Sequence, residues 1–169
     1  MSLELRRLTA AVARAWRELR LEAFALHPRE FRSTPGEEAA MDIAVLETVL
    51  ARQVALGLVD GGSLVGTGVL SFETRAKLAH LGEIRGVYVR AAYRGAGAAE
   101  RLLKALVAEA QGKVEAVHLT VSDGNGPALR LYTRLGFTPW AFQPRALKLE
   151  DGTFVDEIAM VRRFTAAEA

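Results

Sequence analysis

The chain has 169 residues, half of them hydrophobic and a quarter charged, with a net formal charge of only +2. This composition suits one globular domain over residues 1–169 and excludes a disordered or fibrous chain. No segment approaches the roughly 18 consecutive apolar residues of a membrane span, and the small charge argues against a nucleic-acid-binding surface. Cysteine is absent, which excludes disulfides, thiolate metal sites and cysteine nucleophiles. We therefore expect a cytoplasmic domain without membrane or nucleic-acid partners.

The first third of the chain predicts one short strand and two helices. Residues 3–8 alternate in part between apolar and polar side chains, as strands do. Apolar residues then recur every three or four positions after Thr9, a helix cap, and predict a helix that ends at His27-Pro28. These apolar positions are Val12, Trp16, Leu19, Ala23 and Leu26. A second helix is expected over residues 36–53, which open with two glutamates where the helix dipole favours negative charge.

The middle of the chain changes to strand patterns. Residues 56–72 predict a hairpin around a Gly-Gly turn. Residues 78–89 predict a long strand that can bend at Gly82 or Gly86. A loop of small residues over 94–99 then leads directly into a helix with apolar residues at helical spacing.

The last third alternates strand and helix before a final hairpin. A strand is expected over residues 114–121, and Pro127 is placed to open a helix that Gly136 ends. Residues 137–142 and 154–161 predict the final strands. The order β-α-α-β-β-β-α-β-α-β-β predicts an α+β fold, with about seven strands in a mixed, mostly antiparallel sheet and about four helices.

The loop over residues 94–99 has the properties of an anion site. The first amides of a helix have no partner inside the helix, and the helix dipole places partial positive charge at this end. Glycine and alanine let a phosphate approach the backbone, and an arginine adds a positive side chain. The residues are Arg94, Gly95, Ala96, Gly97, Ala98 and Ala99. An ordinary tight turn from strand to helix is the alternative that the loop alone leaves open.

Two nucleotide-binding motifs fit this loop poorly. A Walker loop needs Gly-Lys followed by Ser or Thr, and the chain has no such triplet. The dinucleotide fingerprint is closer, because Gly95-x-Gly97 is followed by Glu115 where a ribose-binding acid belongs. Its third small position, however, is Glu100, whose long charged side chain prevents the close packing of helix on strand that the motif requires.

Two motifs together resemble those of the GNAT superfamily of N-acetyltransferases. The first is Arg94-x-x-Gly97-x-Ala99, which follows Val87-Tyr88-Val89. The second is Asn125-x-x-Ala128-x-x-Leu131-Tyr132-x-x-x-Gly136-Phe137. Weaker similarity near Leu19–Phe31 and in Asp156-Glu157-x-x-Met160 extends the resemblance over nearly the whole chain.

The resemblance implies a GNAT-like fold, acetyl-CoA as cosubstrate and a role for each motif. The pyrophosphate of coenzyme A would bind the amides of residues 94–99, and the pantetheine arm would pair with the strand edge at Val87, Tyr88 and Val89 as an added strand. Asn125 would contact the pantetheine or order its loop, and Tyr132 would protonate the departing thiolate. The residues alone favour a turn or helix cap for Asn125 and a core aromatic for Tyr132, and only the resemblance favours the functional roles.

Acetylation of an amine also requires a base, because an ammonium has no lone pair with which to attack a thioester. Glu83 lies on the strand before the loop, where some members of the family carry their catalytic glutamate. In a regular strand Glu83 shares a face with Val87 and Val89, and a bulge at Gly86 would change that. A surface glutamate paired with an arginine is the alternative. His80 and His118 are weaker candidates, and because neither has a partner at metal-ligand spacing we expect no metal site.

We therefore expect an N-acetyltransferase that passes an acetyl group directly to a primary amine of a small molecule or peptide. The alternative is a non-catalytic domain on the same fold that binds or senses acyl-CoA. The acceptor would be bound between the loop at residues 31–35 and the final hairpin. There, Trp140, Phe142 and Arg145 would line either its pocket or a dimer surface. Association as a homodimer is implied by the resemblance alone.

Overall fold

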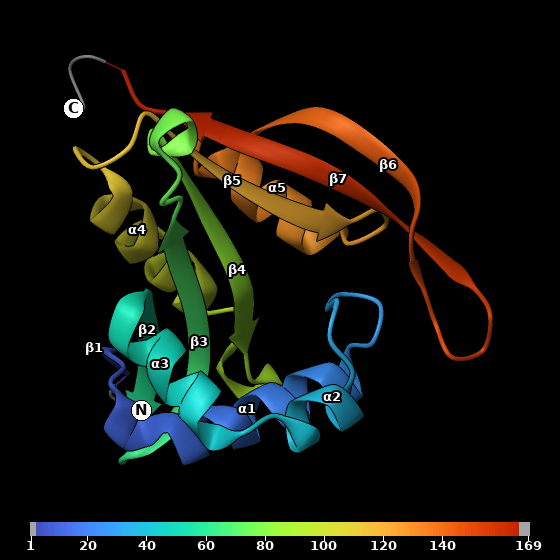
Figure 1. The fold of residues 1–169 in the computed structure, drawn as a ribbon. Coiled ribbons are helices and arrows are strands. Elements are labelled where there is room, and N and C mark those ends of the chain that lie inside the picture. Colours follow the sequence, from blue (N-terminus) through green and yellow to red (C-terminus); the bar gives the residue numbers. More distant parts are fainter. Residues whose placement is uncertain (1–2, 166–169) are drawn as a thin grey trace.

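A computed structural model describes residues 3–165, which form one seven-stranded sheet in the order β1-β2-β3-β4-β5-β7-β6 (Figure 1). The strands are β1 (Glu4–Arg7), β2 (Val54–Asp60), β3 (Ser63–Phe72), β4 (Leu81–Val89), β5 (Ala116–Ser122), β6 (Thr138–Lys148) and β7 (Phe154–Arg163). The helices are α1 (Ala13–Leu26), α2 (Pro35–Ala40), α3 (Ile43–Arg52), α4 (Ala98–Ala110) and α5 (Gly126–Arg134). The α+β fold with a mostly antiparallel sheet is confirmed, with five α-helices where about four were expected. None of the helices within residues 3–165 is long and apolar enough to cross a membrane.

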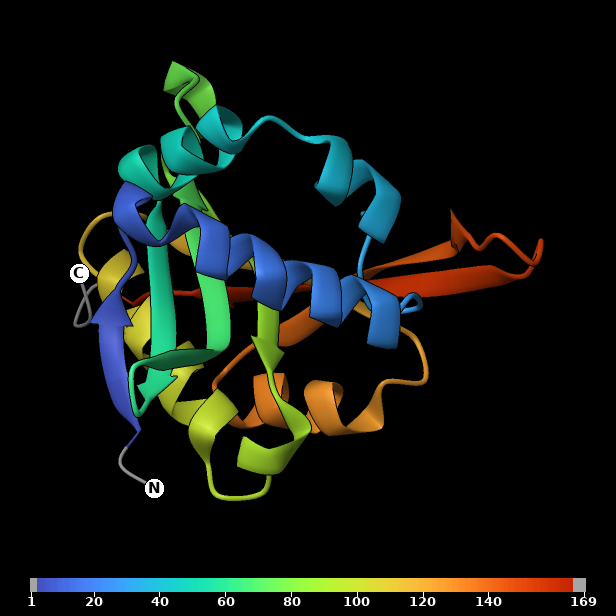
Figure 2. The same cartoon turned by 90° about the horizontal axis from the view of Figure 1, so that it is seen from below.

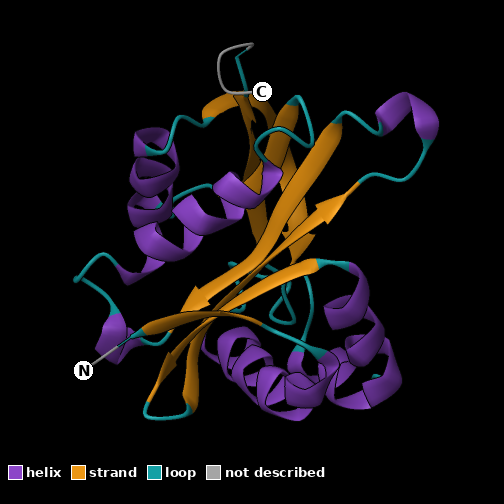
Figure 3. Ribbon diagram, turned by 90° about the vertical axis from the view of Figure 1, so that its left-hand side faces the viewer, coloured by secondary structure: helices purple, strands orange, loops and turns teal. Residues whose placement is uncertain are grey.

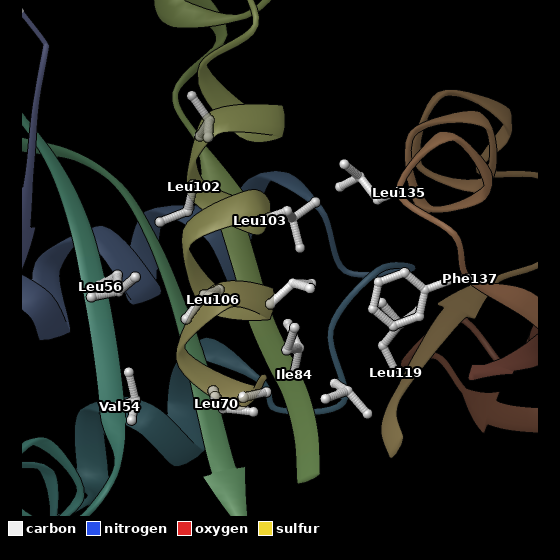
Figure 4. Packing of buried hydrophobic residues seen from close by; sticks show 14 of the residues in the cluster. Val54, Leu56, Leu70, Ile84, Leu102, Leu103, Leu106, Leu119, Leu135 and Phe137 are labelled. Atoms are coloured by element: carbon white, nitrogen blue, oxygen red, sulfur yellow. The ribbon is translucent and has the colours of Figure 1, made fainter. Parts of the chain in front are cut away.

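Helices cover both faces of the sheet. Helix α1 runs across the strands on one side (Figure 2), where α2 and α3 also lie, and α4 and α5 cover the other side (Figure 3). We call these sides the α1 face and the α4 face. The larger core lies on the α4 face, where Leu102, Leu103 and Leu106 of α4 pack between the strands and the Leu135–Phe137 turn after α5 (Figure 4). Trp16 and Leu46 anchor the smaller core beneath α1 and α3.

The sheet opens between β4 and β5. These two strands are parallel and pair only over Leu81–Glu83 and Ala116–His118, and every other pair of strands is antiparallel. Beyond this short contact β4 and β5 diverge, so that a V-shaped opening separates the two halves of the sheet (Figure 1). The divergence exposes an edge of each strand in the middle of the molecule, where a ligand can reach it.

A β-bulge at Gly86 decides which side chains face which way. Thr67 of β3 pairs with Tyr88 but Val69 pairs with Arg85, so two β4 residues lie opposite one β3 residue. Gly86 takes the left-handed conformation, with φ 61°, that such a bulge requires. Of the two glycines at which the sequence allowed a bend, Gly86 is therefore the one used.

The bulge separates Glu83 from the valines that follow it. Ile84 and Val89 both belong to the core on the α4 face, whereas Tyr88 packs under α1. Since side chains alternate along a strand, Glu83 lies on the α1 face with Tyr88, opposite Val89. Glu83 and Val89, which would share a face in a regular strand, therefore lie on opposite faces of the sheet.

Replacing Gly86 by alanine is expected to lower the free energy of unfolding by about 1–2 kcal/mol. The cost comes from the positive φ, because the nearest atom to an added Cβ, Arg20 Nη1, is 3.9 Å away. Gly36→Ala is the matched control, since Gly36 lies in α2 with only Thr34 Oγ1 nearby at 4.0 Å, and alanine there should add about 0.5–1 kcal/mol. Urea denaturation measures both, and equal effects of the two changes would contradict the role of the bulge.

The single helix expected over residues 36–53 is two helices in the structure. Helix α2 begins with a capping box, in which Thr34 and Glu37 satisfy each other's backbone amides. The backbone is extended at Met41 and Asp42, and Asp42 caps α3 by accepting a hydrogen bond from the Ala44 amide at 2.9 Å. The apolar spacing in the sequence continues through this break. The only sequence signal of the break is therefore Asp42, a residue type that caps helices.

The first helix faces the core with a slightly different set of residues than predicted. Trp16, Leu19 and Ala23 are buried as expected, but Val12 is 37% exposed and Leu26 is 64% exposed. Val12 belongs to a 3-10 turn that precedes α1, and the side chain of Thr9 makes no cap hydrogen bond. Ala13 and Phe24 are buried instead, because the packed stripe of α1 turns toward β4 near its end.

Strands β6 and β7 form a long arm that projects from the body of the molecule (Figure 2). The expected strand over residues 137–142 is the first part of β6, which continues to Lys148. Trp140 and Phe142 are 60% and 56% exposed on this edge strand.

Candidate active site

A cavity of about 450 Å³ occupies the opening between β4 and β5. Its walls are residues 84–89 of β4 and 119–122 of β5. Three further elements close it: the segment between α1 and α2, the loop before α4, and the first turns of α5. From these come His27, Glu30, Phe31, Arg94, Ala99, Asn125, Pro127, Ala128, Leu131 and Tyr132. Both sequence motifs contribute to this cavity, the first only through Arg94 and Ala99, because residues 95–98 do not line it.

The loop before α4 presents unpaired backbone donors. Gly95 and Gly97 have φ values of 85° and 78°, which favour glycine, and Gly97 is the N-cap of α4. The first bond of the helix runs from the Arg101 amide to the Gly97 carbonyl at 2.9 Å. Within residues 3–165 no oxygen accepts a hydrogen bond from the amides of residues 95–100. The loop thus has the free donors and the dipole of an anion site, as the sequence predicted.

Arg94 is fixed at the rim of the cavity. Its Nε donates to the Val89 carbonyl at 2.7 Å, and its Nη2 lies 3.1 Å from His27 Nε2. Its guanidinium also lies 5.6 Å from the centre of the Tyr88 ring. These contacts hold a positive charge beside the loop amides without neutralising it.

Strand β4 offers a backbone edge to the cavity. Its pairing with β5 ends at Glu83, and no strand among the described residues pairs with this edge over residues 84–89. The predicted binding segment, Val87 to Val89, lies on this open edge. Unpaired strand edges can accept an extended chain with amide groups as an additional strand.

Asn125 caps α5 and also faces the cavity. Its Oδ1 accepts a hydrogen bond from the Ala128 amide at 3.2 Å, and its Nδ2 donates to the Glu30 carboxylate. Asn125 therefore occupies a position in which it can both cap α5 and contact a ligand in the cavity. Glu30 was not singled out from the sequence, because its partner is 95 residues away and no local pattern marks the contact.

Tyr132 lines the cavity from α5, about two helical turns after Asn125. The side chain is half-buried and packs edge-on against Phe137, with the ring centres 6.1 Å apart. Burial, and next the negative charge of Glu30, raise the pKa of Tyr132 to about 12. The phenol therefore keeps its proton at neutral pH and can donate it.

Glu83 lies at the vertex of the V, where it pairs in register with His118. It does not line the cavity, although its neighbours Ile84 and Arg85 do. The carboxylate is exposed, and among the described residues no side chain forms a hydrogen bond or ion pair with it. The alternative in which Glu83 pairs with a neighbouring arginine is therefore not observed. Burial, and next the charge of Arg163, lower the pKa of His118 below its ordinary value.

A polar network ties α1 to β4 beside the cavity. Tyr88 Oη donates to Glu22 Oε1 at 2.9 Å, and Arg90 binds the same carboxylate at 2.8 Å. Hydrogen bonding from Arg90 lowers the pKa of Glu22, and burial together with the bond to Glu22 raises the pKa of Tyr88. Glu22 is 66 residues from Tyr88 in the chain, and the sequence carries no signal of this contact.

The final hairpin contributes nothing to the cavity wall. Trp140, Phe142 and Arg145 are all absent from its lining, and whether they border an acceptor pocket or a dimer surface stays a prediction. The hairpin formed by β6 and β7 extends away from the cavity. The Arg145 guanidinium lies over the ring of Phe154, 3.9 Å from the ring centre. Within residues 3–165 no cluster of three His, Asp or Glu side chains is placed to hold a metal ion.

A second hollow, of about 800 Å³, lies at the other end of the β4–β5 contact. It is bordered by His80, Lys113, Glu115 and Arg163, among others, and by Thr165 at the end of the described chain. It contains neither the loop amides nor Tyr132, and we assign the chemistry to the smaller cavity.

Comparison with known proteins agrees with this geometry. The sequence model of the Acetyltransferase (GNAT) family matches residues 13–137, and no curated protein sequence matches the chain. Many solved structures share the fold. A GNAT-family acetyltransferase from Streptococcus pneumoniae has a TM-score of 0.83 and 22% identity, over 96% of this chain and 100% of that one.

Two similar structures contain acetyl-CoA. The yncA protein of Salmonella typhimurium, solved with its cofactor acetyl-CoA, has a TM-score of 0.82 and 22% identity, over 100% of this chain and 98% of that one. A phosphinothricin acetyltransferase from Sinorhizobium meliloti, in complex with acetyl-CoA, has a TM-score of 0.81 and 24% identity, over 97% of this chain and 89% of that one. Because the family match spans most of the chain and includes both motifs at the cavity, the chain belongs to the GNAT family of acetyltransferases.

Proposed function

We propose that the protein is an acetyl-CoA-dependent N-acetyltransferase that acts on a primary amine of a small molecule or peptide. The observation that carries this proposal is that two features border a single cavity: the loop with the unpaired amides, through Arg94 and Ala99 at its two ends, and the protonated phenol of Tyr132. The first is a site for the phosphates of the cosubstrate, and the second is a proton donor for its leaving group. The acetyl-CoA complexes of the Salmonella and Sinorhizobium structures support the same cosubstrate.

Acetyl-CoA would bind along the cavity, from the loop before α4 to the bulge of β4. The pyrophosphate would accept hydrogen bonds from the amides of residues 95–99, with Arg94 supplying a positive charge at the rim. The pantetheine arm would run along the open edge of β4 at Val87–Val89, since its two amide groups can extend the sheet. Asn125 would face this arm from α5, held in orientation by Glu30. The thioester then lies between the β-bulge and Tyr132.

The chemistry needs one base and one acid. Glu83 would take one proton from the acceptor ammonium, directly or through a water, which leaves a lone pair on nitrogen. The nitrogen attacks the thioester carbonyl, a C–N bond forms and the C–S bond breaks. Tyr132 gives its proton to the departing sulfur. The second proton lost by the nitrogen restores the phenol through solvent, and the net products are an amide, a thiol and one proton.

A domain that binds acyl-CoA without reacting it is the second candidate function. Such a domain needs the loop amides and the β4 edge but has no use for a buried phenol at the thioester. The position of Tyr132 in the cavity therefore favours the enzyme. A cytoplasmic location and homodimer formation, to which the exposed Trp140 and Phe142 of the arm could contribute, stay predictions.

Acetyl-CoA is expected to stabilise the protein, whereas NADH is not. At about 100 times Kd, binding adds roughly 2.7 kcal/mol to the free energy of unfolding, which raises the unfolding midpoint by about 5–10 °C for a chain of this size.

Arg94→Gln should weaken acetyl-CoA binding about tenfold, because it removes one charge-assisted contact to phosphate. Arg75→Gln is the matched control, since Arg75 is exposed and pairs with Glu73 outside the cavity.

Release of free thiol from acetyl-CoA, measured with a panel of primary amines, separates the two candidate functions. An enzyme releases thiol in proportion to the amine added, and a sensor domain shows stabilisation without release. Absence of stabilisation by acetyl-CoA, or stabilisation by NADH alone, would overturn the proposed cosubstrate.

A further inference from the structure

Arginines in or beside the cavity differ in their partners. Three that flank it without lining it pair with carboxylates. Those ion pairs are Arg20–Glu38, Arg32–Glu157 and Arg90–Glu22. The two arginines that line the cavity, Arg85 and Arg94, pair with no carboxylate within residues 3–165. Arg85 and Arg94 therefore keep a positive charge that an anionic ligand can reach.

The guanidinium of Arg94 lies at the rim of the cavity, whereas that of Arg85 extends across β3 toward Gln53. Arg94 sits beside the loop amides that the proposed function assigns to the pyrophosphate. Arg85 lies on β4 before the bulge, on the α1 face, two residues from Glu83. Acetyl-CoA running along the β4 edge from the loop would reach the bulge and end there, which leaves Arg85 for the second substrate.

The Arg85 guanidinium is held in place and still has donors to give. Its Nη1 donates to Ser71 Oγ at 3.0 Å, and its Nη2 donates to Gln53 Oε1 at 2.6 Å. A guanidinium carries five N–H groups, so three remain, and no other side chain or carbonyl of the described residues accepts from them. A positioned, exposed guanidinium with neutral partners is well suited to bind a carboxylate through two parallel hydrogen bonds.

Glu83 completes a site for a molecule with both charges. An α-amino acid carries its ammonium and its carboxylate on one carbon, so it can bind two oppositely charged side chains that lie two residues apart on one face of a strand. Glu83 faces the same side as Arg85 and its carboxylate forms no hydrogen bond or ion pair in the described part of the chain, although its charge is close enough to act on Arg32 and His118.

We propose that the acceptor is an α-amino acid or a close analogue, whose anionic group binds Arg85 while its amine lies against Glu83. The proposal rests on the proposed acetyl transfer and narrows its acceptor from any primary amine to one with an anion beside the nitrogen. Arg85 is then a specificity-determining residue, and free amines without a negative group are poor substrates.

The test compares amino acids with their neutral counterparts. A panel of L-amino acids and the corresponding amino acid amides is assayed for thiol release from acetyl-CoA, which keeps size and side chain constant and removes only the anion. The protein should prefer at least one amino acid over its amide by about 10- to 100-fold in kcat/KM, the worth of a charge-assisted hydrogen-bonded pair. Arg85→Gln should abolish most of that preference, and Arg85→Lys should retain part of it.

Gln53→Ala separates recognition from a structural role. This variant removes the tether between Arg85 and the end of α3 but keeps the charge. If Arg85 binds the anion, Gln53→Ala retains the preference for amino acids. If Arg85 only anchors α3, Arg85→Gln and Gln53→Ala lower the rates for acids and amides alike.

Three results would overturn the inference. They are equal kcat/KM values for amino acids and their amides, an equal loss of kcat/KM for both in Arg85→Gln, and no reaction with any amino acid. Stabilisation by acetyl-CoA is measured on the same samples. Acetylation of neutral amines with retained acetyl-CoA binding defeats only the inference, whereas failure of acetyl-CoA to bind defeats the proposed function itself.

Discussion

Replacing Tyr132 by phenylalanine is expected to lower kcat by about 10²–10⁴-fold, the usual contribution of a general acid, with little change in the Kd for acetyl-CoA. The phenol lines the cavity, and burial together with the charge of Glu30 raises its pKa to about 12. It is therefore protonated over the whole range in which an acetyltransferase is assayed. Phenylalanine keeps the packing against Phe137 and removes only the proton donor.

Tyr93→Phe is the matched control for this change. The Tyr93 hydroxyl donates to Asp60 at 3.0 Å and does not line the cavity, so its loss should leave kcat nearly unchanged. Steady-state thiol release gives kcat, and calorimetry gives the Kd. A Tyr132→Phe variant with full activity would assign protonation of the thiolate to solvent and return Tyr132 to the role of a core aromatic.

The raised pKa also predicts the alkaline side of the pH profile. Raising a phenol's pKa favours its protonated form, so the acid stays competent as pH rises through its ordinary value of 10 and is lost only near 12. The kcat of the protein should therefore show no decrease assignable to Tyr132 below about pH 10. A decrease centred near pH 9 that Tyr132→Phe removes would show that the phenol is not shielded.

Removing the carboxylate of Glu38 is expected to have the largest effect on stability. Glu38 is 0% exposed on α2, and both its oxygens accept hydrogen bonds from Arg20 of α1, at 2.7 and 2.8 Å. The guanidinium also lies over the rings of Trp16 and Phe24, 4.6 and 5.0 Å from their centres. Glu38→Ala leaves this charge without its counter-ion, which costs about 3–5 kcal/mol and lowers Tm by on the order of 10 °C.

Two further variants test that explanation. Glu47 is exposed on α3 and forms no ion pair in the described part of the chain, so Glu47→Ala should change stability by less than about 0.5 kcal/mol. The double variant Arg20→Met with Glu38→Leu should recover most of the loss, because a buried ion pair is worth little more than apolar side chains of the same shape. Urea denaturation measures all three, and a loss below about 1 kcal/mol in Glu38→Ala would contradict the account.

The Arg20–Glu38 pair also bears on the site, because it fixes the two helices that flank the segment with His27, Glu30 and Phe31. All three residues line the cavity, and Glu30 orients Asn125. A loosened α2 is therefore expected to raise the KM for acetyl-CoA in Glu38→Ala at temperatures where the protein is still folded.

Features that depend on neighbours along the chain were predictable. The glycine loop before α4, the hairpin turn at Gly61-Gly62 and the end of α5 at Gly136 all need positive φ, which glycine supplies. The apolar spacing of α4 likewise identifies its buried face. Local steric and periodic constraints of this kind act over a few residues, and so the sequence shows them directly.

Other elements were mispredicted because two local signals compete or because the covering partner is remote. The pattern over residues 36–53 continues through the break at Asp42, where a capping side chain outweighs helical spacing. Leu26 continues the apolar stripe of α1 but ends exposed, since nothing packs over the last turn of the helix at that position. β6 continues beyond the predicted strand, because pairing with β7 stabilises residues with no apolar pattern of their own.

The sequence alone was thus enough to predict the α+β class and the glycine-rich turn before α4, because each follows from the conformational preferences of adjacent residues, and the two motifs were identified by their resemblance to a known family. The orientation of Glu83 and Arg85 depends on the bulge at Gly86, which forms only when β4 pairs with β3. The contacts of Asn125 with Glu30 and of Arg94 with His27 join segments 95 and 67 residues apart. Contacts over such separations depend on the packing of the whole chain, and no local rule in the sequence contains them.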